Sequence, residues 1–201
     1  MSPVYKFSNA GGFTSKQRYT SMLADNPVFV LASFESIATV SVGSGGAANV
    51  EFTSIPATFT HLQIRGIMRN TASNDYTLRA RFNSDTGSNY ARHTLKGNGT
   101  AVSAVGEATQ NYMTLDEMSP LNSNTANTFG AMVMDILDYQ NTNKYKTVRT
   151  LGGFDANGVG RILFDSSLWQ STSAITSVTI FMALDNLAQY SSFALYGIRS
   201  A

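Results

Sequence analysis

The segment Tyr76-Thr77-Leu78-Arg79-Ala80-Arg81-Phe82 alternates apolar and polar side chains with a period of two. In a β-strand, residues two positions apart lie on the same face. The apolar residues from Tyr76 to Phe82 would therefore share one face, while Thr77, Arg79 and Arg81 would lie on the other. This pattern predicts an antiparallel strand with one face against a core and the other in water.

Short apolar runs separated by turn clusters continue from this segment toward both ends of the chain, starting at about Phe34. The turn clusters are Gly43–Gly46, Asn83–Asn89, Gly97–Gly99, Asn141–Asn143 and Ala156–Gly158. The other expected strands are Ser36–Val42, Asn49–Ser54, His61–Arg69, Tyr90–Lys96, Ala131–Tyr139, Lys146–Gly152, Arg161–Phe164, Ser177–Ala183 and Phe193–Ile198. Many short strands with turns between them are typical of a β-sandwich. Residues 33–201 are therefore expected to form one all-β, antiparallel β-sandwich domain.

Two of these segments are apolar on both faces, namely Ala131–Leu137 and Val178–Leu184. A strand in the centre of a structure, covered on both sides, would have this composition. A strand whose outer face packs against a neighbouring subunit would have it as well. The sequence leaves these two interpretations open.

The composition favours β structure and argues against several functional classes. Charged residues make up only 13% of the 201 residues, about half of the usual ~25%. The net charge of +1 offers no general attraction to nucleic acid, which is not an expected partner. The chain has no cysteine, so disulfides and thiolate chemistry are excluded. We see no signal peptide and no apolar stretch near ~20 residues, so we expect synthesis in the cytoplasm and no membrane partner.

Residues 1–32 differ from the rest and are expected to form a separate N-terminal arm. Thr14–Leu23 is the one place where a short helix is expected, with Thr14 or Ser15 as its N-cap. The candidate anchoring residues of the arm are Tyr5, Phe7, Phe13, Tyr19, Met22 and Leu23. An aromatic segment without a core of its own must dock elsewhere, either on another subunit or assembly or as a strap across its own sandwich.

Catalytic and cofactor motifs are not recognisable in this sequence. His61 and His93 are the two histidines, and neither has the spacing of a metal ligand or of a catalytic base. The chain has no G-x-S-x-G motif, although a Ser/His/Asp triad assembled by the fold stays open. We therefore expect no catalytic residues, no metal and no cofactor, and we predict that the protein is not an enzyme.

Carboxylates form three loose pairs, which are Asp116 with Glu117, Asp135 with Asp138, and Asp155 with Asp165. A glycosidase needs two suitably spaced carboxylates, but solvated strand and turn residues explain these pairs more simply. The loop Asn83–Asn89 has oxygen ligands at alternating positions but lacks the closing glutamate of a calcium loop, so a polar turn is favoured.

Several segments together resemble a group of tailed-phage virion structural proteins, as found in phages of cyanobacteria and other aquatic hosts. The similar segments are Arg18–Ala24, Phe34–Val40, Phe52–Arg65, Phe82–Tyr90, Asn143–Val148 and Tyr190–Ile198. The resemblance spans most of the chain. It implies a jelly-roll-like component displayed on the particle, as a tail-fibre, receptor-binding or capsid-associated protein.

We therefore expect a virion protein, namely a tail-fibre or receptor-binding module that forms a homotrimer and is anchored to other virion proteins by its arm. The host partner would be a surface glycan, with Trp169, Tyr90, Tyr112 and Tyr139 as the candidate sugar-stacking residues. The alternative is a capsid cement or head-decoration protein. A polysaccharide depolymerase is a third and less favoured hypothesis.

Overall fold

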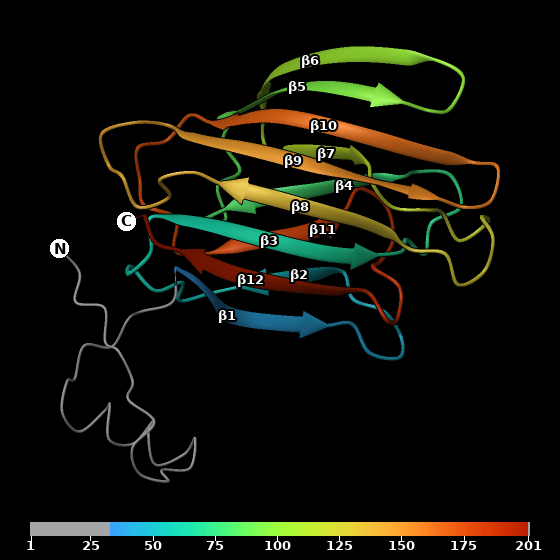
Figure 1. The fold of residues 1–201 in the computed structure, drawn as a ribbon, viewed down its shortest axis with the longest axis horizontal. Helices are drawn as coiled ribbons and strands as arrows, with labels where there is room; N and C mark the ends of the chain where they lie inside the picture. Colours follow the sequence, from blue (N-terminus) through green and yellow to red (C-terminus); the bar gives the residue numbers. More distant parts are fainter. Residues whose placement is uncertain (1–32, 201) are drawn as a thin grey trace, which may run out of the picture. The chain divides into compact units, whose positions relative to one another are not determined.

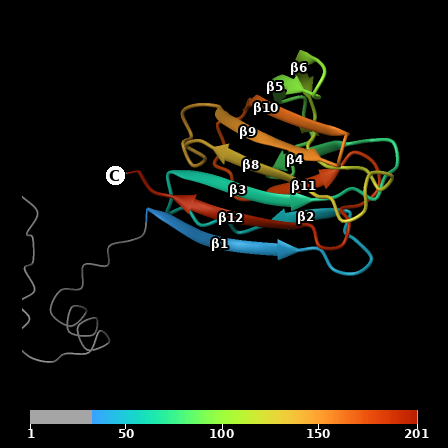
Figure 2. The same ribbon diagram turned by 45° about the vertical axis from the view of Figure 1, so that its right-hand side comes forward.

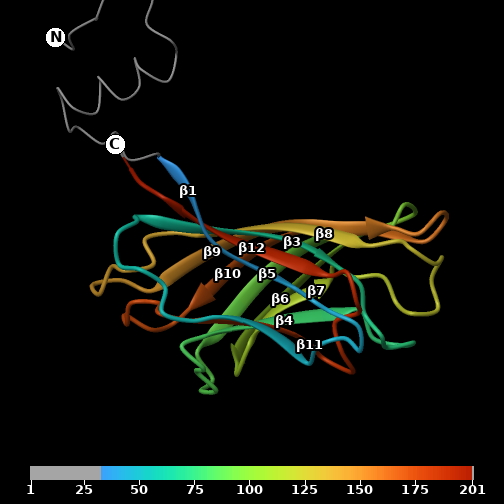
Figure 3. The same ribbon diagram turned by 90° about the horizontal axis from the view of Figure 1, so that it is seen from below.

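The computed structural model describes residues 33–200, which form twelve strands in two antiparallel sheets (Figure 1). The larger sheet has the order β1 (Phe34–Ser41), β12 (Ser192–Ile198), β3 (His61–Met68), β8 (Gly130–Ile136), β9 (Lys146–Asp155), β10 (Gly160–Trp169), β5 (Tyr90–Gly97) and β6 (Val102–Gln110). The smaller sheet has the order β2 (Asn49–Phe52), β11 (Val178–Met182), β4 (Thr77–Phe82) and β7 (Met113–Glu117). The sheets lie over one another as two layers, as the view from below shows (Figure 3). The predicted all-β sandwich is confirmed.

The strand order is that of a jelly roll with additions. Without β1, β12 and the β9–β10 hairpin, eight strands remain, and we number these one to eight along the chain. The smaller sheet then has the order 1-8-3-6 and the larger sheet the order 2-7-4-5. This is the double Greek-key arrangement of a jelly roll. The β9–β10 hairpin is inserted between β8 and β5, and it widens one sheet without widening the other.

The core lies between the two sheets and consists of the inward residues of alternating strands. In β4, Leu78, Ala80 and Phe82 are fully buried, whereas Arg79 and Arg81 are half-buried, as the opening alternation predicts. The other core residues include Leu62, Ile64, Met134, Val178, Ile180 and Leu195, which come from both sheets. These side chains exclude water from the middle of the sandwich, which is the main source of its stability.

Ten of the twelve strands were expected from the sequence, and β6 and β7 were not. Val102–Gln110 is rich in alanine, serine and glycine, which are weak strand formers, and both of its faces are exposed. β7 is short and ends in two carboxylates, Asp116 and Glu117. β10 continues to Trp169, five residues past its expected end, because its inward residues there are polar and resemble a turn in the sequence.

The expected arm lies outside the described residues. This applies to residues 1–32, to the expected helix Thr14–Leu23 and to the anchoring residues Tyr5, Phe7, Phe13, Tyr19, Met22 and Leu23. Among residues 33–200, no helix has the length and hydropathy needed to cross a membrane.

The two doubly apolar strands have different surroundings. In β8, Met132, Met134 and Ile136 are buried, but Val133 is 37% exposed and no other part of residues 33–200 covers its face. In β11, the outward Phe181 is half-buried, and the Arg81 guanidinium lies 4.9 Å from the centre of its ring. The outer face of β8 is therefore not covered by any other part of the described sandwich.

Candidate functional site

The outer face of the larger sheet carries a row of large apolar side chains across four strands. Val133 of β8 pairs with Leu151 of β9, which pairs with Phe164 of β10, which pairs with Leu95 of β5. The last three residues of this row are 54%, 49% and 54% exposed. Residues that occupy the same register on adjacent strands pack side by side, so they form a continuous band.

A second apolar row runs beside the first, two residues along each strand. It consists of Ile67, Ala131, Gly153, Ile162, Gly97 and Val102 in successive strands from β3 to β6. Ile67, Ile162 and Val102 are 52%, 65% and 74% exposed. We call the seven large side chains of the two rows, Ile67, Leu95, Val102, Val133, Leu151, Ile162 and Phe164, the outer apolar face.

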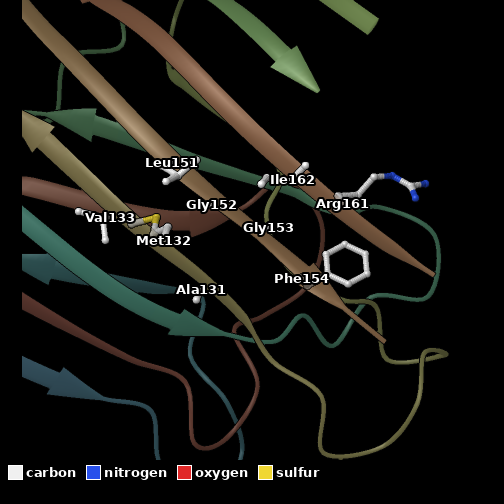
Figure 4. A pocket seen from close by; sticks show the side chains of 9 residues that line it. All are labelled: Ala131, Met132, Val133, Leu151, Gly152, Gly153, Phe154, Arg161 and Ile162. Carbon is white, nitrogen blue, oxygen red and sulfur yellow. The ribbon is translucent and has the colours of Figure 1, made fainter. Parts of the chain in front are cut away.

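A shallow hollow of about 430 Å³ lies in this face, over the first residues of β8 and β10 and the last part of β9 (Figure 4). Gly153 leaves the outer side of β9 without a side chain at this point, and Leu151 and Ile162 stand beside the hollow. Gly153 has φ +149, and a Cβ there would lie 2.0 Å from the Arg161 carbonyl oxygen, so the backbone requires glycine. The hollow is open to solvent and its lining is mostly apolar.

A polar row limits the outer apolar face on its other side. Gln63, Asp135, Arg149, Ser166 and His93 follow one another across β3, β8, β9, β10 and β5. Gln63 donates a hydrogen bond of 2.8 Å to Asp135, and Arg149 donates one of 2.7 Å to the Ser166 hydroxyl. The apolar surface is thus a bounded patch.

The outer apolar face is large for a protein of this size. Seven side chains, each about half exposed, present on the order of 600 Å² of apolar surface, which is the upper end of the range for the largest patch on a monomer. It approaches the ~800 Å² that each partner buries in a standard protein–protein interface. A hollow with few polar groups does not orient a small ligand, which needs several converging polar groups. The surface is suited to another protein surface.

The interior beneath the β10 and β5 part of this face contains a group of buried polar and charged residues. Arg92, which is 5% exposed, donates a hydrogen bond of 2.8 Å to Glu107 and one of 3.0 Å to the Thr94 hydroxyl. Its Nη1 atom also lies 3.5 Å from Asp116 and 3.9 Å from Asp165. We call these five residues the polar cluster. One buried cation thus lies among three carboxylates, two of which are partly accessible to water.

Asp165 is the most deeply buried member of the polar cluster, with no exposed surface. Its burial raises the pKa of the carboxyl group to about 6, although the Thr94 hydroxyl and Arg92 lower it in part. By contrast, the hydrogen bond from Arg92 lowers the pKa of Glu107. The buried Oδ2 of Asp165 and the hydroxyls of Thr150 and Ser167 have no hydrogen-bond partner among the described residues. This interior is therefore costly to maintain.

Beside the polar cluster, a second group of ion pairs joins the two sheets. Glu117 of β7 accepts hydrogen bonds from Lys96 of β5, at 2.8 Å, and from Arg161 of β10. Burial raises the pKa of Glu117, but these two cations outweigh it and leave the pKa lowered. The group therefore ties the β10–β5 end of the larger sheet to the edge of the smaller sheet.

The carboxylate pairs do not form an acid/base site in this structure. Asp116 and Glu117 are each engaged with cations of β5 or β10, and Asp135 is bound by Gln63. Asp138 lies in the turn after β8 and pairs with Lys144. Asp155 lies at the end of β9, whereas Asp165 is opposite Thr150 inside the sandwich. The glycosidase interpretation therefore gains no support from the geometry.

A Ser/His/Asp grouping does occur near the C-terminus, but its tautomer does not suit catalysis. The Ser200 hydroxyl lies 3.5 Å from His61 Nε2, and Asp138 lies 3.4 Å from His61 Nδ1. The backbone N–H of Asp138 donates to Nδ1 at 2.9 Å, which places the proton of the neutral ring on Nε2. Nε2 then donates a hydrogen bond and cannot accept the serine proton.

The other histidine, His93, lies in the polar row of the outer face.

The loop Asn83–Asn89 is held together by its own polar groups. Asp85 accepts hydrogen bonds from the Gly87 N–H, the Asn89 amide and the Trp169 indole, at 2.8, 2.9 and 2.7 Å. Burial raises the pKa of Asp85, but these three hydrogen bonds together outweigh it and leave the pKa lowered. The carboxylate is therefore used inside the loop, as the polar-turn interpretation expects.

Most of the candidate sugar-stacking residues lie inside the sandwich. Trp169, Tyr90 and Tyr139 are 2%, 1% and 0% exposed, so their rings have no free face on which a sugar could stack. Trp169 packs instead with Tyr90 and Phe82. Tyr112 is half-buried, and the Arg79 guanidinium lies 4.0 Å from the centre of its ring. Glycan contact through Tyr112 stays a prediction.

Among residues 33–200, no group of three or more His, Asp or Glu side chains is arranged to hold a metal ion. Searches of protein-family models, of curated proteins and of solved structures gave no match to this chain. The function is therefore inferred from the geometry of the chain itself.

Proposed function

We propose that this protein is a structural component of a phage particle, a tail-fibre or receptor-binding module that forms a homotrimer and is anchored through residues 1–32. The observation that carries the structural role is the outer apolar face. Burying that surface against another subunit would stabilise the assembly by removing apolar area from water. A jelly roll without a catalytic grouping fits a protein that acts by assembling and binding.

The bounded shape of the face supports a defined assembly. Three flat faces placed around a three-fold axis can enclose a common apolar core, and the hollow at Gly152 and Gly153 offers space for a side chain from a neighbour. The polar row at Gln63 and Asp135 would then lie at the rim, as is usual in protein interfaces.

Native mass spectrometry of Phe164→Asp tests this role of the face. A buried carboxylate in the contact would abolish the trimer or weaken it at least tenfold, whereas the fold would persist because Phe164 is already half exposed. Thr39→Asp is the matched control, since Thr39 is exposed on the same face at the far edge of the same row. A wild-type protein that is only monomeric at micromolar concentration contradicts the trimer.

The position in the particle needs a separate experiment. Antibody labelling of intact particles at the tail tip would support the fibre, and labelling over the head would favour the cement protein instead. Release of reducing ends from host surface polysaccharide would favour the depolymerase and contradict a purely structural role.

A further inference from the structure

Strand β6 is a free edge of the larger sheet. It pairs with β5 alone, whereas the opposite edge of the sheet is β1. The views in Figures 1 and 2 show the β5–β6 pair at the end of the sheet, beyond the neighbouring β10. Every residue from Val102 to Gly106 is exposed, so β6 is covered on neither face within the described sandwich. Its second row of backbone N–H and C=O groups is free to pair with another strand.

Sheet edges in natural proteins usually carry features that prevent further pairing, such as lysines, prolines or bulges. The regular part of β6, Val102–Glu107, has no proline and no cation. Its one charge, Glu107, is directed inward to Arg92. The first irregularity comes only after Glu107, where the register with β5 shifts.

The edge strand β1 provides the contrast within the same sheet. A bulge lies between Ser36 and Ala38, and Glu35 of this strand pairs with Arg199. Ile37, Ala38 and Val40 of β1 pack on the core. β1 is thus a protected edge, and β6 is an edge prepared for addition of a strand.

We propose that β6 pairs antiparallel with β6 of a second copy of this chain, across a two-fold axis, to form one continuous sheet. The sequence of β6 is compatible with itself in this arrangement. A centre at Ser103 or Ala104 places Val102–Gly106 opposite small or β-branched residues only, and a centre at any position from Ser103 to Val105 keeps the two Glu107 residues apart. Backbone hydrogen bonds would provide the affinity, as in other cases of strand addition.

The outer apolar face makes the same partner favourable. A two-fold axis perpendicular to the sheet keeps the outer faces of both copies on one side. Val102, which is 74% exposed, lies at the edge next to Gly97 and Ile162 in the second apolar row. Strand addition would join the two apolar faces into one surface that crosses the contact. The β6 contact is therefore a second interface, which accompanies the proposed assembly and does not depend on a role in a phage.

Single cysteines in the full-length chain test the pairing, because the natural sequence has none. Ser103→Cys, Ala104→Cys and Val105→Cys are oxidised at micromolar concentration and separated on a non-reducing gel. Residues opposite each other across an antiparallel pair have Cβ atoms about 4.5–5.5 Å apart, close enough for a disulfide at the centre of the pair. We expect one of the three to cross-link at least tenfold faster than Thr39→Cys on the protected edge. Equal rates at all four positions would overturn the pairing.

Native mass spectrometry of Ala104→Lys gives a second readout that does not depend on oxidation. Two ammonium groups opposite each other would oppose the pairing, while the exposed side chain leaves the fold intact. Six copies in the wild type and three in the variant support both the β6 pair and the trimer. Two copies falling to one support the pair and overturn the trimer. Three copies in both overturn the pair and leave the trimer, and one copy in both overturns both proposals.

Discussion

The two ends of the larger sheet have opposite polarity. At β12 and β3, the inner face is apolar, with Leu62 and Leu195 fully buried, and the outer face carries the exposed Arg65 next to Ile67, where the outer apolar face ends. At the middle of β10 and β5, between the buried Leu163 and Trp169, the inner face carries Asp165 and Arg92, and the outer face carries apolar side chains such as Phe164. The first end is arranged as expected for a lone sandwich, and the second is arranged the other way round.

The difference coincides with the inserted β9–β10 hairpin. The jelly roll of eight strands would bring β8 next to β5, and the hairpin separates them by two strands. The smaller sheet ends at β7, so it has no corresponding extra strands to provide an apolar inner partner. Polar groups bridge the sheets there instead. The hairpin contributes Leu151, Ile162 and Phe164 to the outer apolar face and Asp165 to the polar interior.

Arg92→Met would have the largest effect, because it removes the buried cation of the polar cluster. We call the part of the larger sheet at β10 and β5, where polar groups face inward and apolar groups outward, the inverted end. Arg92 faces the carboxylates of Glu107, Asp116 and Asp165, and its removal leaves them without their main counter-charge. Breaking a buried ion group from one side typically costs about 3–5 kcal/mol. We expect a loss of about that size in the free energy of unfolding, measured by urea denaturation at pH 7.

Arg65→Met is the matched control at the other end of the sheet. Arg65 is exposed on the outer face, where its guanidinium lies 5.3 Å from the centre of the Phe34 ring. An exposed contact of this kind contributes about 1 kcal/mol or less. Equal losses for the two variants would contradict a difference in kind between the ends.

Asp165→Asn is expected to have the second-largest effect, and the effect depends on pH. The pKa of Asp165 is raised from 3.8 to about 6 in the folded state, mainly by burial. The folded state therefore binds this proton more tightly than the unfolded state, so ionisation lowers the stability of the wild type as pH rises from about 4 to about 6. A shift of two pKa units corresponds to about 3 kcal/mol. The asparagine cannot ionise, so the stability of the variant does not decrease in this way as the pH rises.

The measurement is the difference in unfolding free energy between Asp165→Asn and the wild type at pH 4 and at pH 7. From pH 4 to pH 7, the unfolding free energy of the variant should rise by about 3 kcal/mol relative to that of the wild type. The attraction between Arg92 and the ionised Asp165 exists at pH 7 but not at pH 4, and the pKa of about 6 already includes it. Asp155→Asn, which removes an exposed carboxylate from the same hairpin, is the control. A difference that is flat with pH would mean that Asp165 is not desolvated.

The sequence predicts the regular end of the sheet well. Alternation in β4 and the runs in β3, β8, β11 and β12 identify the strands, and the assumption that apolar residues face inward gives the correct core there. The jelly-roll order is seen only in the structure, because strand pairing between distant segments leaves no local pattern in the sequence.

The inverted end could not be predicted, for a physical reason. A period of two says that the faces of a strand differ, but not which face meets the core. In β5, Leu95 faces outward while Arg92 and Thr94 face inward, and in β10 Phe164 faces outward while Asp165 faces inward. In the sequence, the apolar composition of both faces of Ala131–Leu137 and Val178–Leu184 was compatible with a subunit contact, but these segments include only Val133 of the outer apolar face.

The smallest expected effect comes from Asp135→Asn, which sharpens the boundary of the outer apolar face. Asp135 lies in the polar row, half-buried, and accepts a hydrogen bond from Gln63 that an asparagine oxygen can also accept. We expect a change below about 0.5 kcal/mol in unfolding free energy, as for other surface substitutions. Rim charges alter association rates and their salt dependence more than affinity. Sedimentation equilibrium should therefore give an association constant within about threefold of the wild type, and a tenfold loss would place the polar row inside the contact and extend the interface toward β3.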